Sequence, residues 1–393
     1  MNYYTFDYPA AEADSVALYA AMVPQPEISD TAYALQIGVA APEVTAEDRA
    51  NLNLTWVMDT SCSMDGAPMD KAREAGIAAA SQLKAGDIVS MVTWSTARDV
   101  VLDGHVVTRP NDPVVIEAFE DLSAGGGTDL NAGLTYGYYY ADINRSDAMV
   151  NRLVLVSDGG ANVGITDADI IANYAGNRDE DGIYMVGLGV GNAWTYDPEL
   201  MDTVTDLGRG ASLYANDSSE VWKSMGSDFI NTMDVAARDV QVRLDLPPGF
   251  EIIRFSGEEY SEDPEEIEPQ HLAPNDTMVF LQTIDTCAPE LLVDDTQFDV
   301  HVTWKHPVTF EEQEATLTTS LSELLDADPT LLRKGQAVYE YAEALKDWRN
   351  TSLPTTERAA AILAAADAVD TALALDPDDL DLAEIQVILD NLE

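Results

Sequence analysis

Residues 51–63, NLNLTWVMDTSCS, decide the fold of this chain. The run from Leu52 to Met58 is apolar enough for a strand that is buried on both faces, and it ends at Asp59. The alanine-rich segment 69–83 that follows has the composition of a helix. A buried strand that leads directly into a helix is typical of the strand–helix–strand unit and predicts a parallel sheet.

The same alternation continues to about residue 236. We expect further strands at 87–94, 98–106, 152–156, 183–188 and 211–214, and helices at 113–119, 130–140, 167–175, 198–207 and 219–233. Buried strands that alternate with helices predict a doubly wound parallel sheet with helices on both faces. We therefore assign residues 51–236 to one α/β domain.

The flanking regions have different patterns. Two strand-like runs, 15–22 and 31–39, fall within an N-terminal region 1–50, and five more, at 240–246, 250–255, 278–283, 298–304 and 314–319, fall within 237–321 without intervening helices. Alternating polarity in consecutive strands predicts an antiparallel sandwich or barrel. Residues 322–393 predict a small helical unit with helices near 329–348, 355–375 and 380–389.

Polar side chains follow three of the strands in the α/β domain. The segments are Asp59-Thr60-Ser61-Cys62-Ser63, Gly125-Gly126-Gly127-Thr128-Asp129 and Ser157-Asp158-Gly159-Gly160. In an open α/β sheet, ligands bind beyond the carboxyl ends of the strands, so these loops are expected to converge. Hydroxyl and carboxylate oxygens suit Mg²⁺, Mn²⁺ or Ca²⁺, whereas zinc and copper prefer His and Cys.

The spacing of these residues resembles the metal-ion-dependent adhesion site (MIDAS) of von Willebrand factor type A (VWA) domains. That pattern combines Asp-x-Ser-x-Ser, a downstream Thr in a glycine-rich loop, and a later Asp-Gly, which here fall at Asp59, Ser61, Ser63, Thr128 and Asp158. The resemblance implies that the serines and the threonine contact the metal directly or through water, and that the aspartates act through bridging water. A partner's Asp or Glu would complete the metal shell. Asp, Ser and Thr are also common in helix caps and turns, so any one of these segments taken alone could be a cap or turn without a metal.

Nearly the whole chain resembles the YfbK-type bacterial VWA proteins. The matching segments are Asn2 to Pro9, Asn151-Arg152-Leu153, Asn162-Val163-Gly164, Ala237 to Val240 and Lys334 to Leu345. The resemblance implies that residues 1–50 and 238–320 fold together as a β-sandwich into which the VWA domain is inserted. It also implies a longer natural N-terminus with a secretion or lipoprotein signal, and hence an extracellular, periplasmic or cell-surface location. Cytoplasmic location is the alternative.

Cys62 departs from the family, which usually has Gly between the two serines. Three interpretations are open: a disulfide to Cys287, a buried inert thiol, or a reactive thiol. A nucleophilic cysteine needs a base or a lowered pKa, and none of the four histidines lies in the site loops.

Composition limits the possible partners. The chain has 71 acidic and 20 basic residues, a formal net charge of −51, so binding to nucleic acid or to an anionic membrane is excluded. The charge indicates either surface hydration in high salt or non-specific accumulation of cations. No apolar stretch of eighteen residues predicts a transmembrane helix. The glycine-rich segments lack the lysine of a phosphate-binding loop and the spacing of a dinucleotide-binding turn.

Together these features predict a metal-dependent protein-binding or adhesion module that is not an enzyme. The rival function is a regulatory or assembly partner of an ATPase or of other cell-envelope machinery. A metal-assisted hydrolase would need a general base, and outside the five site positions the loops offer only Asp65 and Asp129.

Overall fold

The structure is a computed structural model that describes two compact units. The described residues are 4–95, 98–127, 129–146, 148–159, 183–192, 196, 198–208, 210–256, 261, 270–291, 293–307 and 309–392. Val44–Asp234 form the first unit, here called the α/β unit. Met1–Glu43 and Val235–Glu393 form the second, here called the sandwich unit. The helix expected at 167–175 lies outside the described residues.

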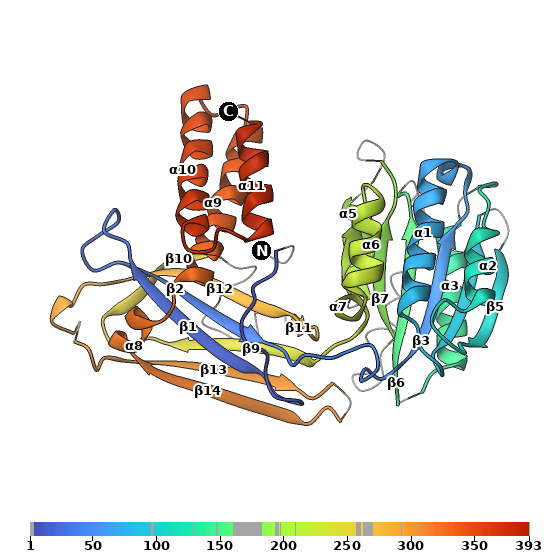
Figure 1. Cartoon of the computed structure of the whole chain (residues 1–393), viewed down its shortest axis with the longest axis horizontal. Coiled ribbons are helices and arrows are strands. Elements are labelled where there is room, and N and C mark those ends of the chain that lie inside the picture. Colours follow the sequence, from blue (N-terminus) through green and yellow to red (C-terminus); the bar gives the residue numbers. More distant parts are fainter. Residues whose placement is uncertain are drawn as a thin grey trace. The chain divides into compact units, whose positions relative to one another are not determined.

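The α/β unit is built on a six-stranded sheet with the order β5-β4-β3-β6-β7-β8 (Figure 1). Its strands are β3 (Asn51–Asp59), β4 (Ile88–Trp94), β5 (Arg98–Val106), β6 (Met149–Ser157), β7 (Tyr184–Gly189) and β8 (Ser212–Tyr214). All neighbours pair in parallel except β4 and β5. The predicted parallel sheet thus carries one antiparallel edge strand, because only three residues separate β4 from β5 and a parallel crossover needs a dozen or more.

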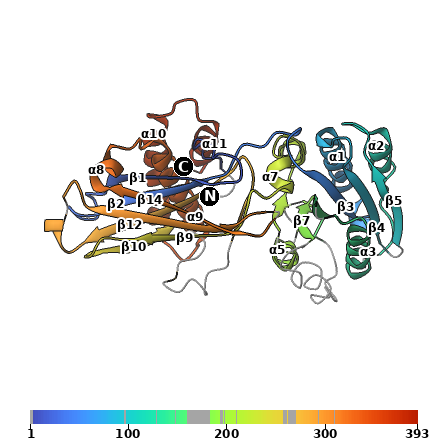
Figure 2. The same ribbon diagram turned by 90° about the horizontal axis from the view of Figure 1, so that it is seen from below.

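Helices cover both faces of this sheet (Figure 2). One apolar cluster joins α1 (Ala67–Gln82), α2 (Pro113–Glu120), α6 (Ser218–Trp222) and α7 (Phe229–Met233) to one face, and a second joins α3 (Leu130–Ile143) and α5 (Pro198–Leu207) to the other. The doubly wound architecture is therefore confirmed. Successive residues of β3 point to opposite clusters, with Trp56 in the first and Val57 in the second.

The last helical segment of the α/β unit is interrupted, although a single helix was expected from 219 to 233. A π-helical turn, η2 (Lys223–Ser227), separates α6 from α7. Here the amide of Asp228 donates to the carbonyl of Lys223 five residues earlier, and the Thr232 hydroxyl donates to the Ser224 carbonyl. These bonds replace regular α-helical pairing at the interruption.

The sandwich unit contains two antiparallel four-stranded sheets. The first has the order β1-β2-β12-β10 and the second β11-β9-β13-β14. Their bounds are β1 (Ala17–Pro24), β2 (Tyr33–Ala40), β9 (Ala237–Asp245), β10 (Phe250–Ser256), β11 (Gln270–Leu272), β12 (Thr277–Thr286), β13 (Gln297–Lys305) and β14 (Glu312–Ser320). Because β2 pairs with β12 along eight residues, the expected joint sandwich of N-terminal and later strands is confirmed. The three-residue β11 was not expected, since it is too short to show an alternating pattern.

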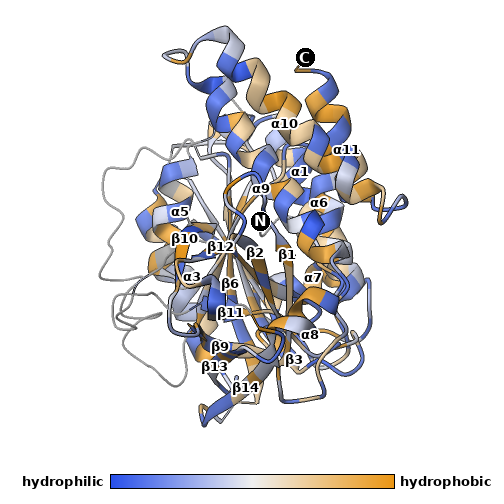
Figure 3. Ribbon diagram, turned by 90° about the vertical axis from the view of Figure 1, so that its left-hand side faces the viewer, coloured by the Kyte–Doolittle hydropathy of each residue, from blue (hydrophilic) through white to orange (hydrophobic). Residues whose placement is uncertain are grey.

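Helices complete the sandwich unit. They are α8 (Leu321–Asp326), α9 (Thr330–Arg349), α10 (Thr355–Leu373) and α11 (Leu380–Asp390), and the last three share an apolar core (Figure 3). The unexpected α8 begins at a capping box between Ser320 and Glu323. Among the residues that the structure describes, no helix is both long and apolar enough to cross a bilayer.

A buried lysine joins the parts of this helical region. The ammonium of Lys334 on α9 lies 2.8 Å from carboxylate oxygens of both Asp379 and Asp381, beside the start of α11. Asp381 also accepts from the amide of Thr5 at 3.1 Å, which ties the N-terminal segment to the same point. Burial opposes the charge on Lys334, but the two carboxylates outweigh it and raise the pKa of the lysine.

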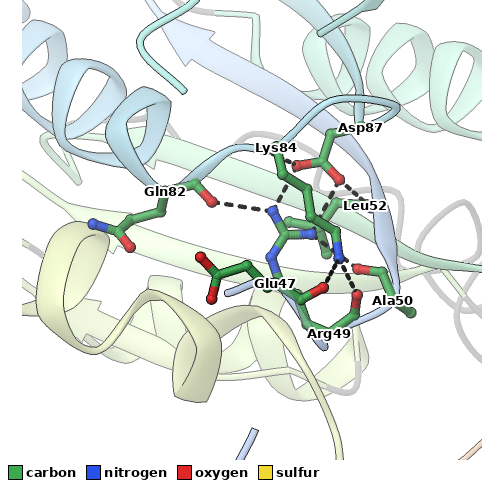
Figure 4. Close-up of polar contacts among 7 residues, drawn as sticks. All are labelled: Glu47, Arg49, Ala50, Leu52, Gln82, Lys84 and Asp87. Carbon is green, nitrogen blue, oxygen red and sulfur yellow. Dashed lines mark hydrogen bonds and ion pairs between the residues drawn. The ribbon is translucent and has the colours of Figure 1, made fainter. Parts of the chain in front are cut away.

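A second buried ion pair fixes the start of β3 (Figure 4). The guanidinium of Arg49 contacts both carboxylate oxygens of Asp87, at 3.0 and 2.6 Å, and the two side chains are 1% and 0% exposed. Asp87 also accepts from the amides of Leu52 and Lys84, and Arg49 donates to the carbonyl of Gln82. The pair therefore connects the segment before β3 to the turn between α1 and β4.

The two cysteines are free, and both are exposed. Of the three interpretations left open by the sequence, the Cys62–Cys287 disulfide and the buried thiol at Cys62 are therefore wrong. Cys62 lies in the loop after β3 of the α/β unit, whereas Cys287 follows β12 in the sandwich unit. Each thiol is exposed within its own unit.

Removing Asp87 is expected to destabilise the α/β unit strongly. In Asp87→Ala the Arg49 guanidinium stays buried without its partner, which typically costs about 3–5 kcal/mol. Asp103→Ala, at an exposed position of β5, is the control and should change stability by less than about 0.5 kcal/mol. Guanidinium titrations followed by circular dichroism measure both variants. Equal midpoints for the two would contradict the assigned role of the ion pair.

Both thiols should react in the native protein. Iodoacetamide added without reductant is expected to give two adducts by intact mass, because both side chains are exposed and unbonded. Cys62→Ser and Cys287→Ser should each give one adduct. If the wild-type protein gains adducts only after reduction, the two cysteines form a disulfide and this prediction is wrong.

Candidate metal centre

Two aspartates meet at the carboxyl edge of the sheet. Asp59 is the last residue of β3, and Asp158 directly follows β6. These strands are parallel neighbours, with Met58 opposite Val156, so the residues after them emerge side by side. Both carboxylates are buried, at 0% and 3% exposure. Burial of two acids at one point is unfavourable unless donors or a cation compensate for it.

Hydrogen bonds hold Asp59 in a fixed orientation. One carboxylate oxygen accepts from the amide of Ser61 at 2.8 Å, and the other accepts from the hydroxyl of Ser157 at 2.8 Å. Ser157 in turn accepts from the amide of Gly159 at 3.2 Å. Burial raises the pKa of Asp59, these donors lower it in part, and the nearby charge of Asp158 raises it further.

The two serines lie in the loop that leads from β3 to α1. Ser61 is buried and begins the short 3-10 turn η1 (Cys62–Met64), while Ser63 is exposed within that turn. Their hydroxyl oxygens are 3.0 Å apart. The turn therefore brings two oxygen donors together beside Asp59.

The glycine-rich loop before α3 is attached to the same place. The amide of Gly125 donates to the Thr60 carbonyl at 2.7 Å, and the amide of Cys62 donates to the Gly126 carbonyl at 3.2 Å. Gly126 has φ of 94°, a conformation that favours glycine, as does the 75° of Gly159 after Asp158. Thr128 itself lies outside the described residues. Four of the five expected site positions are thus described, and Asp59, Ser61, Ser63 and Asp158 lie on two adjoining loops.

Other residues near the site have structural contacts. Asp129 caps α3, since one of its carboxylate oxygens accepts from the amide of Ala132 at 3.0 Å. Tyr196 stacks on Tyr214 with ring centroids 4.5 Å apart and packs over Gly189.

The donors favour a hard cation. Where the structure is described, no three His, Cys, Asp or Glu side chains form a group that could hold a metal ion. The two carboxylates, the two hydroxyls and the backbone around them are all oxygen donors, and they fit Mg²⁺, Mn²⁺ or Ca²⁺. Ser157 received no role from the sequence, although its position opposite the end of β3 could have identified it as the partner of Asp59.

Comparison with known proteins identifies the α/β region. The profile of the von Willebrand factor type A domain matches residues 53–244. The uncharacterized protein YfbK of Escherichia coli K12 is 25% identical over 261 residues, which are 64% of this chain and 44% of YfbK. The uncharacterized protein sll0103 of Synechocystis is 27% identical over 214 residues, 54% of this chain and 49% of that protein. The chain thus spans about half or less of the length of these curated relatives.

A solved structure shares the fold. The von Willebrand factor type A protein from Catenulispora acidiphila aligns with a TM-score of 0.52 and 16% identity, over 92% of this chain and 88% of that one. VWA domains often mediate protein–protein interaction or adhesion, and they commonly bind a divalent metal. The resemblance to VWA proteins is therefore confirmed: the chain contains a von Willebrand factor type A domain, matched over residues 53–244, and the α/β unit makes up most of that match.

Proposed function

We propose that this chain is a divalent-metal-dependent protein-binding or adhesion module. Asp59, Ser61, Ser63, Thr128 and Asp158 would hold the metal, which would be Mg²⁺, or alternatively Mn²⁺ or Ca²⁺. A carboxylate from a partner protein would complete the metal shell.

The separation of the two serine hydroxyls carries this proposal. Mg²⁺ binds six oxygens at about 2.0–2.1 Å in octahedral geometry, which places neighbouring ligands about 2.9 Å apart. The two hydroxyl oxygens of Ser61 and Ser63 are 3.0 Å apart, a separation that two adjacent ligands of one metal ion would also have. The same distance allows a hydrogen bond between them when no metal is bound.

Electrostatics supports a cation at this position. Asp59 and Asp158 are both buried, and after burial itself the charge of Asp158 adds to the raised pKa of Asp59. A divalent cation would favour the ionised form of both. If the serines and threonine bind directly and the aspartates act through water, the direct ligands are largely neutral. The cation then keeps a strong affinity for an anionic oxygen from outside, such as the carboxylate of an Asp or Glu.

Binding is favoured over catalysis by the groups at the site. Asp59 is engaged by Ser61 and Ser157, and Asp129 caps a helix. None of the four histidines lies in the site loops, so a hydrolase would have to use the exposed Asp65, two residues after Ser63, as its general base. We therefore propose a module that captures a partner and does not transform it.

The free thiols support a second candidate function. Exposed unbonded cysteines are usual in reducing compartments, whereas secreted proteins tend to form disulfides. This favours a cytoplasmic regulatory or assembly partner of an ATPase machine over a secreted, periplasmic or cell-surface adhesin. Both candidates use the same metal and the same capture of a carboxylate, so they differ in partner and location only.

Metal titration tests the shared part of both candidates. Calorimetric titration of chelator-treated wild-type protein with Mg²⁺, Mn²⁺ and Ca²⁺ should show one tight site above the weak binding of the acidic surface. Asp158→Ala should lose that site, and the exposed-surface variant Asp103→Ala should retain it. Identical curves for wild type and Asp158→Ala would falsify the metal proposal.

Capture of a carboxylate can be tested with a matched pair of small molecules. The water-proton relaxation of protein-bound Mn²⁺ should decrease on addition of N-acetyl-aspartate amide, because the carboxylate displaces a bound water. N-acetyl-asparagine amide has nearly the same shape without the charge and should have no effect. An equal response to both compounds, or to neither, would argue against a partner carboxylate as the last ligand.

A further inference from the structure

Lys71 on α1 makes an unusual set of contacts. Its ammonium donates to the carbonyl oxygens of Gly191 at 3.0 Å, Ala215 at 2.9 Å and Asn216 at 3.3 Å. An ammonium has three N–H donors, so these carbonyls can satisfy all of them. The acceptors lie in two loops, one after β7 and one after β8, at the carboxyl edge of the sheet.

One of these loops lies directly against Asp158. A Cβ atom on Gly191 would lie 2.4 Å from the carbonyl oxygen of Asp158, so the two backbones are in contact and only glycine fits there. The amide of Val190 also donates to the carbonyl of Ser157 at 3.0 Å. The backbone at Gly191 thus limits movement of the Asp158 segment toward the loop after β7.

Lys71 is also connected to the loop between β3 and α1 that holds Ser61 and Ser63, here called the serine loop. Ser61 and Ser63 precede α1, which begins at Ala67, and Lys71 lies in the second turn of that helix. The same helix holds the region after β8 at a second point, because Glu74 accepts from the hydroxyl of Ser218 and from the indole of Trp222. Lys71 therefore links the helix that follows the two serines to the loop that supports Asp158.

We propose that Lys71 is a positioning residue of the metal site, which sets the spacing between the serine loop and Asp158 through Gly191. This inference rests on the proposed metal-binding function. Lys71 is not itself a metal ligand, since its ammonium is fully occupied by carbonyl oxygens and carries the wrong charge.

Positioning and electrostatics predict opposite results when Lys71 is replaced. A positive charge near the site repels a divalent cation, so its removal would strengthen metal binding if charge were its only contribution. Loss of positioning would weaken metal binding, because residues that orient metal ligands typically contribute about 10- to 100-fold in affinity. The sign of the change therefore separates the two roles.

The test compares Lys71→Met with Lys84→Met in the full chain. Lys84 is a matched control, because its ammonium also donates to backbone carbonyls, those of Glu47 and Arg49, but at the amino end of β3. We expect Lys71→Met to bind Mn²⁺ roughly tenfold more weakly than wild type, as in other supporting positions of metal sites. Lys84→Met should lower the unfolding midpoint and leave the Mn²⁺ affinity unchanged.

Two further measurements separate positioning from general loss of structure. Gly191→Ala, which keeps Lys71, should also weaken Mn²⁺ binding because its methyl group displaces Asp158. In metal-free Lys71→Met, hydrogen exchange should accelerate at residues 157–159 and 188–192, with little change around Asp87.

The outcomes distinguish this inference from the function on which it rests. A wild-type protein without an Asp158-dependent site overturns both. If wild type has the site but Lys71→Met binds Mn²⁺ with equal or greater affinity, only the positioning role is overturned. A Lys84→Met variant that loses metal affinity to the same extent also overturns it, because the effect would then follow stability and not position.

Discussion

The parallel pairing of β3 with β6 is the constraint on which the candidate site depends. With Met58 opposite Val156, Asp59 and Ser157 emerge at the same edge, and the hydroxyl of one reaches the carboxylate of the other at 2.8 Å. A shift of one residue would turn every side chain of β3 to the opposite apolar cluster. The packing of both faces therefore fixes the register, and the register fixes the site.

The two ends of β3 are held by different chemistry. At its start the charges of Arg49 and Asp87 are paired and fully buried, and backbone amides complete the contacts. At its end Asp59 and Asp158 are both acids, and the donors that the described residues Ser61 and Ser157 offer to Asp59 are neutral. The start of β3 thus carries a paired cation and anion, whereas two acids meet at its end. This difference supports a cation at the carboxyl edge, where Lys71 of α1 donates to backbone carbonyls.

Much of this arrangement could be predicted from the sequence, because it follows from local patterns. The apolar runs located the strands, and residues after successive parallel strands must meet at one edge. The antiparallel β5 could also have been predicted from its three-residue connection. The free cysteines could not, since the spacing of cysteines in a sequence does not show whether their thiols are exposed. The contacts of Lys71 could not be predicted from the sequence either, because its acceptors are backbone carbonyls at least 120 residues away, which no residue type marks.

The split of the sandwich unit has a consequence for how the chain is made. β2 pairs with β12, so the pairing of Ala40 with Thr277 cannot form until the ribosome has added 237 more residues. At about 5–20 residues per second this delay is roughly 10–50 s, during which the whole α/β unit emerges and can fold alone. The hairpin of β1 and β2 meanwhile exposes the edge that β12 will cover. The α/β unit can therefore fold before the sandwich is complete, and the β1–β2 hairpin is the part that needs protection from other chains in the meantime.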